Sequence, residues 1–355
     1  MRPISPVRYL VWLVASALLF FAGVWLWVAE MPLAYLDPEY PSWLAKQQML
    51  GKCDLGDVLV VGDSRAAVNI MPGLLNVSAT NLAVGGGQAI EAYVAVNRAL
   101  ACPVLPRRVI ISLNAGHFVQ PDLFWERSVR FGFLDRAELT DVLRTAQRLG
   151  DRSVLAPYHD DGLTPLLRAN LYAMRFPSLY FNGVLKGGVF LRLWRNQATL
   201  RAGLASRGQY FFGTDPGSSA VAAEGGLERF VPLPVQDYYF ARMLVRLAAK
   251  DIPVDFIAMP LNRSTHAQVL PAVERDYGAY LAGYAARFSN FTVVGKVMPD
   301  WPDRFFGDAF AHLNPGGAAL YSAGLGVCLR ARLDGRTGDC EIGWSGREVS
   351  AVQAP

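Results

Sequence analysis

The chain alternates short apolar runs with longer amphipathic stretches. The short runs are bounded by turn residues and are typical of buried strands; they span residues 58–61, 79–84, 109–113, 254–259 and 291–294. The longer stretches carry apolar positions at helical spacing and are long enough for crossover helices; they span residues 88–101, 235–250, 272–288 and 316–332. Strands that alternate with helices predict an α/β domain with a mostly parallel, doubly wound sheet of five strands.

One long interval interrupts this alternation, between the third strand and the helix that precedes the fourth. Residues 115–233 contain a predicted helix at 135–149 and glycine-rich turns at 183–188, 208–217 and 224–226. In open α/β sheets the ligand site lies beyond the carboxyl ends of the strands. We therefore expect this insertion to form a cap over that edge of the sheet.

The first apolar run is longer than all the others. Residues 9–29 carry no charge over 21 positions, close to the roughly 20 residues that cross a bilayer as a helix. Arg2 and Arg8 precede the run, and Glu30 and Asp37 follow it, which predicts a cytoplasmic N-terminus. The run is too long for a signal-peptide core and shows no convincing cleavage site before Glu30, so we expect an uncleaved transmembrane anchor.

These features divide the chain into four parts. Residues 1–30 are the expected anchor, 31–56 a Pro-containing tether, 57–345 the α/β body and 346–355 a tail. A single anchor with this orientation places the body on the outer face of the inner membrane, which in a bacterium is the periplasm.

Composition and charge limit the classes of partner. Of the 355 residues, 52% are apolar and 18% are charged, which excludes a disordered chain. The 34 basic and 30 acidic residues give a net charge of +4 with no basic block, so no nucleic-acid partner is expected. The turn at residues 85–87 lacks the Walker lysine and the dinucleotide spacing, so nucleotide binding is not indicated.

Four cysteines allow three disulfide pairings. Cys53 and Cys102 each stand a few residues before a predicted strand, so in a parallel sheet both would lie near the same edge. Cys328 and Cys340 flank a turn-rich stretch that can bring them together. We therefore expect both disulfides, as suits a compartment outside the cytoplasm, with four reduced, buried thiols as the alternative. No zinc site is expected, because the cysteines lack CxxC spacing.

The most informative stretch is residues 58–65, where a buried apolar run ends in Gly62-Asp63-Ser64-Arg65. A serine at the C-terminal tip of a strand is both exposed and held in place. Its hydroxyl can attack an acyl carbonyl when a histidine removes the proton, and nearby backbone N–H groups can stabilise the developing negative charge. Simple capping of the next helix by Asp63 or Ser64 is the alternative.

The far end of the chain supplies the other groups that such a serine needs. His312 lies in the sequence Asp308-Ala-Phe-Ala-His-Leu-Asn-Pro-Gly-Gly, directly before the last predicted helix. A base and an acid that can orient it are therefore both available. An early nucleophile with a late acid and base is one of several chain orders that form a serine triad.

Four blocks together resemble those of the SGNH/GDSL hydrolase superfamily over residues 58–322. They are Gly62-Asp63-Ser64, the glycine turn at 85–87, Asn114 after the third strand, and His312-Leu-Asn-Pro-Gly-Gly. The resemblance implies a flavodoxin-like sheet of the SGNH hydrolase type. It also implies Ser64 as nucleophile and His312 as general base.

The same resemblance implies Asp308 as the acid that orients His312. The family usually places this acid three residues before the histidine, where this chain has Ala309. Asp303 is therefore an alternative acid, and an acid-free dyad is a further alternative.

The oxyanion donors implied by the resemblance are the Ser64 amide, the Gly86 N–H and the Asn114 side chain. The third block reads Ser-Leu-Asn-Ala-Gly-His instead of the family's Gly-x-Asn-Asp. We expect Arg65, His117 and Arg263 to contact the substrate, with a packed histidine and a solvated loop as the alternatives for the last two. No metal, nucleotide or other cofactor is required.

The expected function is that of a membrane-anchored periplasmic serine esterase or O-acyltransferase. Its substrate would be acyl groups, acetyl above all, on a cell-envelope or exported polysaccharide such as cellulose, because anchored members of the superfamily serve alginate, cellulose or peptidoglycan modification. A transferase would also need an acyl donor from a membrane partner. The alternatives are a non-catalytic component of a polysaccharide synthesis or export complex and an anchored sugar-binding module.

Overall fold

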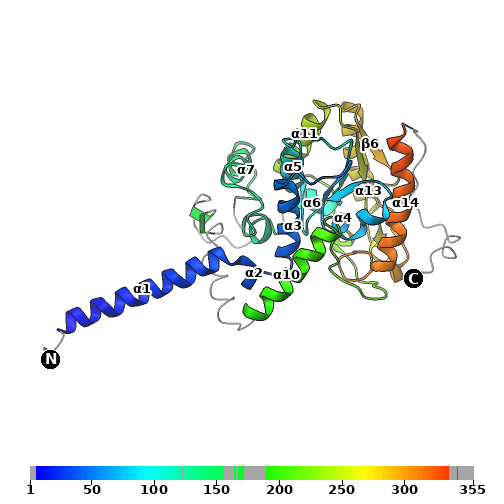
Figure 1. The fold of residues 1–355 in the computed structure, drawn as a ribbon. Coiled ribbons are helices and arrows are strands. Elements are labelled where there is room, and N and C mark those ends of the chain that lie inside the picture. The colour runs from blue at the N-terminus through cyan, green and yellow to red at the C-terminus, as the bar shows by residue number, and fades with distance from the viewer. Residues whose placement is uncertain are drawn as a thin grey trace.

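The computed structural model describes residues 5–120, 123–155, 164, 167–168, 170–171, 189–335 and 342. Helix α1 (Pro6–Glu30) projects from the rest of the molecule (Figure 1). Its segment Pro6–Trp27 has a mean hydropathy of 2.2 and none of it is buried. At 1.5 Å per residue α1 is about 37 Å long, which exceeds the roughly 30 Å apolar core of a bilayer. The predicted long apolar helix is therefore present, and its length suits either a membrane anchor or a signal segment.

The body is built around one parallel sheet. Its strands run in the order β2 (Ala79–Asn81), β1 (Val58–Gly62), β3 (Arg108–Ser112), β4 (Val254–Ile257) and β6 (Phe291–Val294). Every neighbouring pair is parallel. This confirms the predicted α/β class and the five predicted strands. The order is that of the doubly wound sheets in which the chain changes direction beside its first strand.

The sequence explains why these segments become central strands. Residues 58–61 are Val-Leu-Val-Val, and all of β1 is buried because helices cover both faces of the sheet. The strand β2 ends three residues earlier than the predicted run, at Asn81. Its chain nevertheless continues along β1, since the Leu82 and Val84 N–H groups donate to the carbonyls of Val60 and Gly62.

Helices cover the sheet in two groups. The helices and short helical turns of the body are α2 (Pro32–Tyr35), α3 (Tyr40–Gly51), α4 (Ser64–Asn69), α5 (Ala89–Ala99), α6 (Ala115–Val119), α7 (Arg136–Arg148), α10 (Val189–Ala205), α11 (Pro234–Ala248), α12 (Arg263–His266), α13 (Pro271–Arg287), α14 (Pro315–Leu333), η1 (Pro72–Leu74), η2 (Phe124–Val129), η3 (Ala223–Gly226) and η4 (Asp303–Phe305). Helices α5, α11 and α13 pack together, and α4 packs on α14. Right-handed crossovers place α5, α11 and α13 on one face of the sheet and α4 and α14 on the other.

The segment 31–56 is more than the tether expected from the sequence. Its helix α3 is packed into the core, where Trp43 is fully buried together with Ala45, Met49 and Leu50. Helix α10 lies against α2 and α3, and Asn196 of α10 donates hydrogen bonds to the carbonyls of Leu33 and Leu36. The tether prediction missed this helix because its apolar side chains are interrupted by Lys46, Gln47 and Gln48, so that no clear helical stripe stands out.

The described part of the insertion contains α7, which matches the predicted helix at 135–149, together with α6, η2, α10 and η3. A second small sheet pairs β5 (Leu261–Asn262) with β7 (Asp300–Trp301) and was not predicted. Strands of two residues leave no periodic signal to detect. The glycine-rich turn at 183–188, the tail at 346–355 and Cys340 lie outside the described residues.

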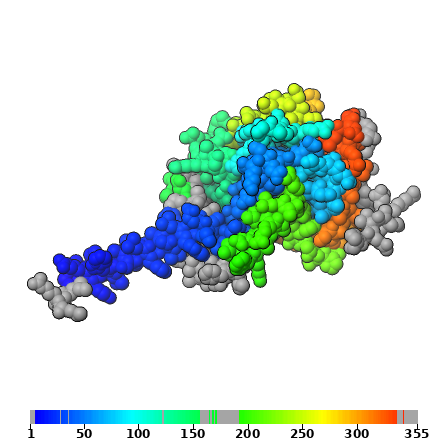
Figure 2. All heavy atoms as spheres, in the orientation of Figure 1, coloured from blue at the N-terminus to red at the C-terminus, as the bar shows by residue number. Residues whose placement is uncertain are grey.

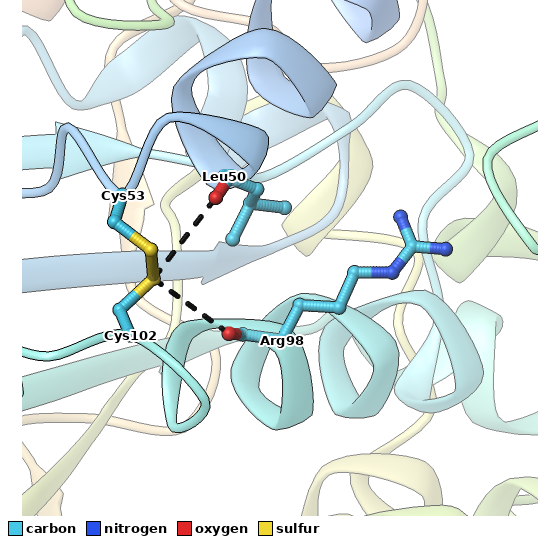
Figure 3. The surroundings of a disulfide bond; sticks show 4 residues. All are labelled: Leu50, Cys53, Arg98 and Cys102. Carbon is cyan, nitrogen blue, oxygen red and sulfur yellow. Dashed lines mark hydrogen bonds between the residues drawn. A yellow bond between two sulfur atoms is a disulfide. The ribbon is translucent and has the colours of Figure 1, made fainter.

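The disulfide predicted between Cys53 and Cys102 is present, with 5.6 Å between the two Cα atoms (Figure 3). It joins the chain just after α3 to the chain just after α5. Helix α3 is therefore covalently tied to the helical layer of the sheet. The second predicted pair remains a prediction, because its partner Cys340 is not among the described residues.

Candidate active site

The predicted site residues gather at the carboxyl edge of the sheet, where β1 and β3 end. Strand β1 ends at Gly62 and is followed by Asp63 and Ser64, and β3 ends at Ser112, two residues before Asn114. The order in which the chain adds strands reverses here, because β2 lies on one side of β1 and β3 on the other. Open α/β sheets bind their ligands at this switch point, outside the carboxyl ends of the strands.

Ser64 is the first residue of α4, and the chain holds it there through Asp63. The Oδ1 atom of Asp63 accepts hydrogen bonds from the N–H groups of Arg65 (2.9 Å) and Ala66 (3.3 Å), which caps the helix. Ser64 itself is partly exposed. Neither its hydroxyl nor its N–H makes a hydrogen bond to a described residue. The capping role therefore belongs to Asp63, and within the described part of the chain the hydroxyl and N–H of Ser64 are unbonded.

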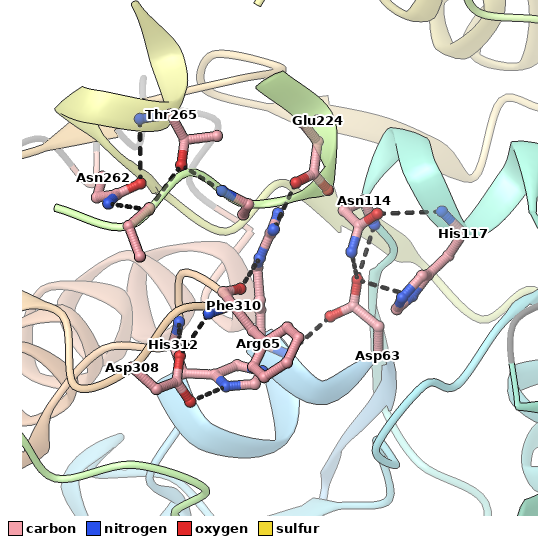
Figure 4. A network of polar contacts seen from close by, with 12 residues as sticks. Asp63, Arg65, Asn114, His117, Glu224, Asn262, Thr265, Asp308, Phe310 and His312 are labelled. Carbon is pink, nitrogen blue, oxygen red and sulfur yellow. Dashed lines mark hydrogen bonds and ion pairs between the residues drawn. The ribbon is translucent and has the colours of Figure 1, made fainter. Parts of the chain in front are cut away.

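His312 and Asp308 form a directly bonded pair. The Nδ1 atom of His312 lies 2.6 Å from Oδ2 of Asp308, and the other carboxylate oxygen accepts from the Phe310 N–H at 2.8 Å (Figure 4). Partial burial acts to raise the pKa of Asp308, but the hydrogen bonds and the charge of His312 outweigh it and lower the pKa. Asp308 is thus an ionised acceptor that fixes the orientation of the imidazole.

The alternative acid, Asp303, is engaged elsewhere. Its carboxylate accepts from the hydroxyl of Ser264 at 2.5 Å and from the Ser264 N–H at 3.2 Å. Among the two acids weighed from the sequence, the structure therefore brings Asp308 and not Asp303 to His312, although Asp308 stands four residues before the histidine. Residues 308–312 lie in a loop in which Ala311 has a left-handed backbone.

The second imidazole nitrogen of His312, Nε2, indicates where another group would bind. Only 4% of the residue is exposed, and its Nε2 atom has no hydrogen-bond partner among the described residues. Buried polar atoms are nearly always satisfied, so an unpartnered imidazole nitrogen indicates a position kept for another group. Ser64 does not fill it here, since no hydrogen bond joins its hydroxyl to Nε2.

Several contacts hold the His312 loop against α4, the helix that Ser64 begins. The Leu313 N–H donates to Oδ1 of Asn69 at 3.0 Å, and Nε of Arg65 donates to the Phe310 carbonyl at 3.3 Å. Ala311 adopts a left-handed backbone conformation with φ of 58°, a strained geometry for a residue with a side chain. Asn314 then caps α14, with Pro315 in its first turn. The distant ends of the body are thereby joined at one place.

An aromatic ring from the insertion packs on the histidine. The Phe212 ring is stacked on the His312 imidazole, with 5.0 Å between the ring centroids. The Phe310 ring lies 6.2 Å from the same imidazole and is 69% exposed. One face of His312 is therefore covered by Phe212, and an exposed aromatic side chain stands beside it.

Asn114 and His117 both turn toward Asp63. The Oδ2 atom of Asp63 accepts from the backbone and side-chain N–H groups of Asn114 at 2.8 and 2.9 Å, and Nδ1 of His117 lies 3.5 Å away. Burial acts to raise the pKa of Asp63, but His117 and Arg65 lower it overall. Burial acts to lower the pKa of His117, and Asp63 raises it overall. Asn114 thus lies at the site, with one amide hydrogen committed to Asp63.

This buried pair predicts a specific dependence of stability on pH. Because the pKa of folded His117 is raised, its contribution is fully present below its ordinary value near 6.5 and is lost as pH rises through the raised value. The lowered pKa of Asp63 has the opposite sense, so the Asp63 contribution is lost as pH falls through the lowered value. We expect the melting temperature to fall as pH rises above neutrality, and His117→Gln to abolish that part of the dependence.

Thermal unfolding followed by circular dichroism across this pH range measures the effect. His266→Gln is the matched control, because no acidic side chain is hydrogen-bonded to His266 among the described residues, and it should keep the wild-type slope. An unchanged slope in His117→Gln would show that the pair carries no net coupling.

The glycine turn at residues 85–87 is in contact with charged side chains from two other segments. A Cβ atom on Gly85 would lie 1.8 Å from Oε1 of Glu39 and 2.9 Å from the Phe212 ring, so a larger residue would have to displace these side chains. Gly86 has φ of 67°, a conformation that glycine adopts without strain. Glu39 pairs with Arg127 at 2.7 Å and accepts from the indole N–H of Trp43 at 3.0 Å. Burial raises the pKa of Glu39 despite the opposing charge of Arg127. The Glu39–Arg127 pair therefore lies against the turn in which the resemblance places an oxyanion donor.

A buried lysine supports the same turn. The Lys46 ammonium donates to the carbonyl of Ala83, two residues before Gly85, and burial lowers the pKa of this amine to about 7. Glu39, Lys46 and Arg127 were missed from the sequence. They lie in the presumed tether and in the insertion, and no local motif marks a charge that becomes buried only when distant segments meet.

The two arginines expected to contact substrate have other partners. Arg65 is buried and forms a 2.6 Å ion pair with Glu224 of η3 (Figure 4). Burial acts to lower the pKa of Arg65, but Glu224 raises it overall. Arg263 is exposed and its Nε lies 3.2 Å from Asp300. Arg65 thus anchors the insertion to the site, and the substrate contacts of both residues stay predictions.

The interior side of this network offers little space. A cavity of about 10 Å³ is lined by Asp63, Arg65, Asn114, Glu224 and Tyr277 among others, which is room for one water molecule. Ser64 is partly exposed and Phe310 is exposed, so both are accessible to solvent. In the described part of the chain, no three His, Cys, Asp or Glu side chains are grouped to hold a metal ion.

Comparison with protein-family models, curated proteins and solved structures finds no match to this chain. The fold and the site therefore define its class in general terms. It is an α/β protein with a five-stranded parallel sheet, an N-terminal apolar helix, one described disulfide and a buried polar network at the carboxyl edge of the sheet.

Proposed function

We propose that this protein is a serine esterase or O-acyltransferase in which Asp308, His312 and Ser64 act as a triad, as in the SGNH/GDSL hydrolases that its sequence blocks resemble. The observation that carries the proposal is the Asp308–His312 pair, bonded at 2.6 Å, whose outer Nε2 atom is buried and unpartnered among the described residues. The loop that presents this atom is hydrogen-bonded to α4, and Ser64 is the first residue of that helix.

The proposed reaction has two halves. His312 Nε2 takes the hydroxyl proton of Ser64 as Oγ bonds to the acyl carbon, and a tetrahedral oxyanion forms. The C–O bond to the departing alcohol then breaks, His312 returns the proton to that alcohol, and an acyl-Ser64 ester remains. Water or a sugar hydroxyl, deprotonated by His312, attacks this ester and restores Ser64. Asp308 stabilises the imidazolium that forms in each half.

The oxyanion would be stabilised by two backbone N–H groups and one side-chain amide. The N–H groups of Ser64 and Gly86 donate to no described residue. The second hydrogen of the Asn114 amide is the third candidate, since the first is donated to Asp63. Donors that are already fixed in place lower the barrier because they need no reorganisation when charge develops.

We further propose an acylated, most simply acetylated, polysaccharide of the cell envelope as substrate, with the body in the bacterial periplasm and α1 as a single-pass inner-membrane anchor. The exposed apolar surface of α1 and the Cys53–Cys102 disulfide support a place outside the cytoplasm. The exposed Phe310 ring beside His312 offers an apolar face to a sugar or acyl group. For transfer, a membrane partner would supply the acyl donor.

A second candidate is a non-catalytic component of a polysaccharide synthesis or export complex. It is favoured by one observation, that Ser64 makes no hydrogen bond to His312 in the absence of substrate. The two candidates differ in whether an acyl-enzyme forms.

The test uses the full chain in detergent and p-nitrophenyl acetate. An esterase or transferase releases p-nitrophenol and shows an acetylated Ser64 peptide by mass spectrometry after acid quench. Added sugar alcohols that accelerate release, with formation of the acetylated sugar, indicate transfer over hydrolysis. A folded protein with no release and no acetyl-Ser64 would leave the non-catalytic component as the function.

Arg127 provides a test of the glycine turn in this mechanism. Arg127→Met removes the ion-pair partner of Glu39. Since Glu39 and Arg127 pack against Gly85 and Gly86, the Gly86 N–H should then no longer point toward the oxyanion. We expect kcat for p-nitrophenyl acetate to fall by about 10- to 100-fold with KM little changed, because misplacement of a catalytic group has effects of this size. Arg127→Lys should restore part of the rate, since it keeps the charge.

The control for that variant is Arg242→Met, which breaks a half-exposed ion pair with Asp141 of α7. It should leave kcat unchanged. A wild-type kcat in the Arg127→Met protein would show that the Glu39–Arg127 pair does not contribute to catalysis.

A further inference from the structure

The N-terminal half of α10 carries an unusual exposed surface. Trp194 is 69% exposed, and Arg195 and Ala198 beside it are also exposed. The helix Val189–Ala205 contains three arginines and no acidic residue. Apart from α1, Trp194 and Phe310 are the two most exposed aromatic side chains of the described residues, and only Phe310 is close to the candidate active site.

The position of this surface is fixed by Asn196. Its buried side-chain amide donates to the carbonyls of Leu33 and Leu36 at 3.0 and 3.1 Å. Leu33 stands three residues after the end of α1 at Glu30, a span of at most about 11 Å even when fully extended. The polar layer on each side of a bilayer is about 5–8 Å thick. The middle of α10 is thus held within reach of the membrane surface that α1 enters.

The pictures agree with this placement. In Figure 1 the N-terminal end of α10 lies at the end of the body from which α1 projects, beside α2. Figure 2 shows the same green helix as an outer surface of the body at the base of α1. The C-terminal end of α10 points away from α1 toward the centre of the body.

We infer that the N-terminal half of α10 docks on the headgroup layer of the bilayer, with Trp194 inserted at the interface and Arg195 against anionic lipid phosphates. Tryptophan is enriched at membrane interfaces because its ring is apolar and its N–H is polar. Arginine binds phosphate through paired N–H groups and is drawn to the negative surface of the membrane. The absence of acidic residues in α10 removes the charge that would oppose this contact.

Docking would fix the orientation of the body on the membrane. Helix α10 packs along α3, and Glu39, the N-cap residue of α3, contacts the glycine turn. The site would then hold a constant height and direction relative to the bilayer, as suits a substrate that emerges from it. The inference rests on α1 spanning the bilayer, which resistance of the full chain to extraction by alkaline carbonate tests separately.

The test places a fluorescent probe on the docked face and leaves Trp194 and Arg195 intact. Ala198→Cys is one turn from Trp194 on the same face, and the exposed Ala205→Cys is about 10 Å further along α10. Each variant is labelled with nitrobenzoxadiazole and reconstituted by α1 into vesicles of phosphatidylcholine with a minor fraction of phosphatidylglycerol. Wild-type protein treated in the same way gives the labelling background.

We expect headgroup-attached spin labels to quench the probe at 198 several-fold more than the probe at 205, and aqueous iodide to show the reverse order. Trp194→Ala with Arg195→Gln in the Ala198→Cys protein should remove the difference, and phosphatidylcholine alone should weaken it. Equal lipid quenching at 198 and 205 would overturn the inference. A probe at 198 shielded from both quenchers would also overturn it, because protein and not lipid would then cover this face.

Discussion

Replacing Ser64 with alanine should lower kcat for p-nitrophenyl acetate by about 10⁴-fold or more, the size of effect seen when a triad nucleophile is removed. The physical reason is the loss of the only atom able to form the acyl-enzyme. Asp63, and not Ser64, caps α4, so the variant should keep the wild-type melting temperature. The initial rate of p-nitrophenol release measures the effect.

Ser264→Ala is the matched control for that experiment. Ser264 also stands in the first turn of a short helix, and its hydroxyl is bonded to Asp303 at 2.5 Å. Its loss should leave kcat within a few-fold of wild type. Equal activity of Ser64→Ala and the wild-type protein would remove Ser64 from the mechanism.

Replacing Asp308 with asparagine should lower kcat by about 10³- to 10⁴-fold, because a neutral amide can donate to Nδ1 of His312 and thus select the tautomer with its proton on Nε2. That tautomer cannot accept the proton of Ser64. The 2.6 Å contact between Asp308 and His312 and the lowered pKa of the acid both support this role. The measurement is kcat at neutral pH with the folded state checked by thermal unfolding.

Asp303→Asn separates the two acids that the sequence left open. Asp303 contacts Ser264 and not His312, so this variant should keep most of the wild-type kcat. The reverse result, with Asp303→Asn inactive and Asp308→Asn active, would contradict the assignment of the acid.

The sequence predicted the central sheet well because its strands are local, strongly apolar signals. Residues 291–294 were matched at both ends. The strands that begin at residues 58, 79 and 254 start where predicted and end one to three residues away from the predicted end, and β3 is shifted by one residue. The parallel arrangement of the sheet followed from the alternation of strands with helices. The packed helix α3 escaped prediction, because its burial depends on α10, a helix about 150 residues away.

The candidate site was predicted in part. Asp308, His312 and the cap of α4 lie in short motifs, and the structure joins the first two directly. The ion pairs Arg65–Glu224 and Glu39–Arg127 could not be predicted, because each joins segments far apart in the chain and gains its strength only from burial. The stacking of Phe212 on His312 was missed for the same reason.

The most direct test of the account is the rate at which a fluorophosphonate modifies Ser64, mapped by peptide mass spectrometry in wild-type protein and in His312→Gln. A hydroxyl activated by His312 should be the main site of modification, and the rate should fall by at least about 100-fold in the variant, as expected for loss of a general base. Absence of label on Ser64 in folded wild-type protein, or the same rate in both proteins, would contradict the claim that this serine and this histidine act together.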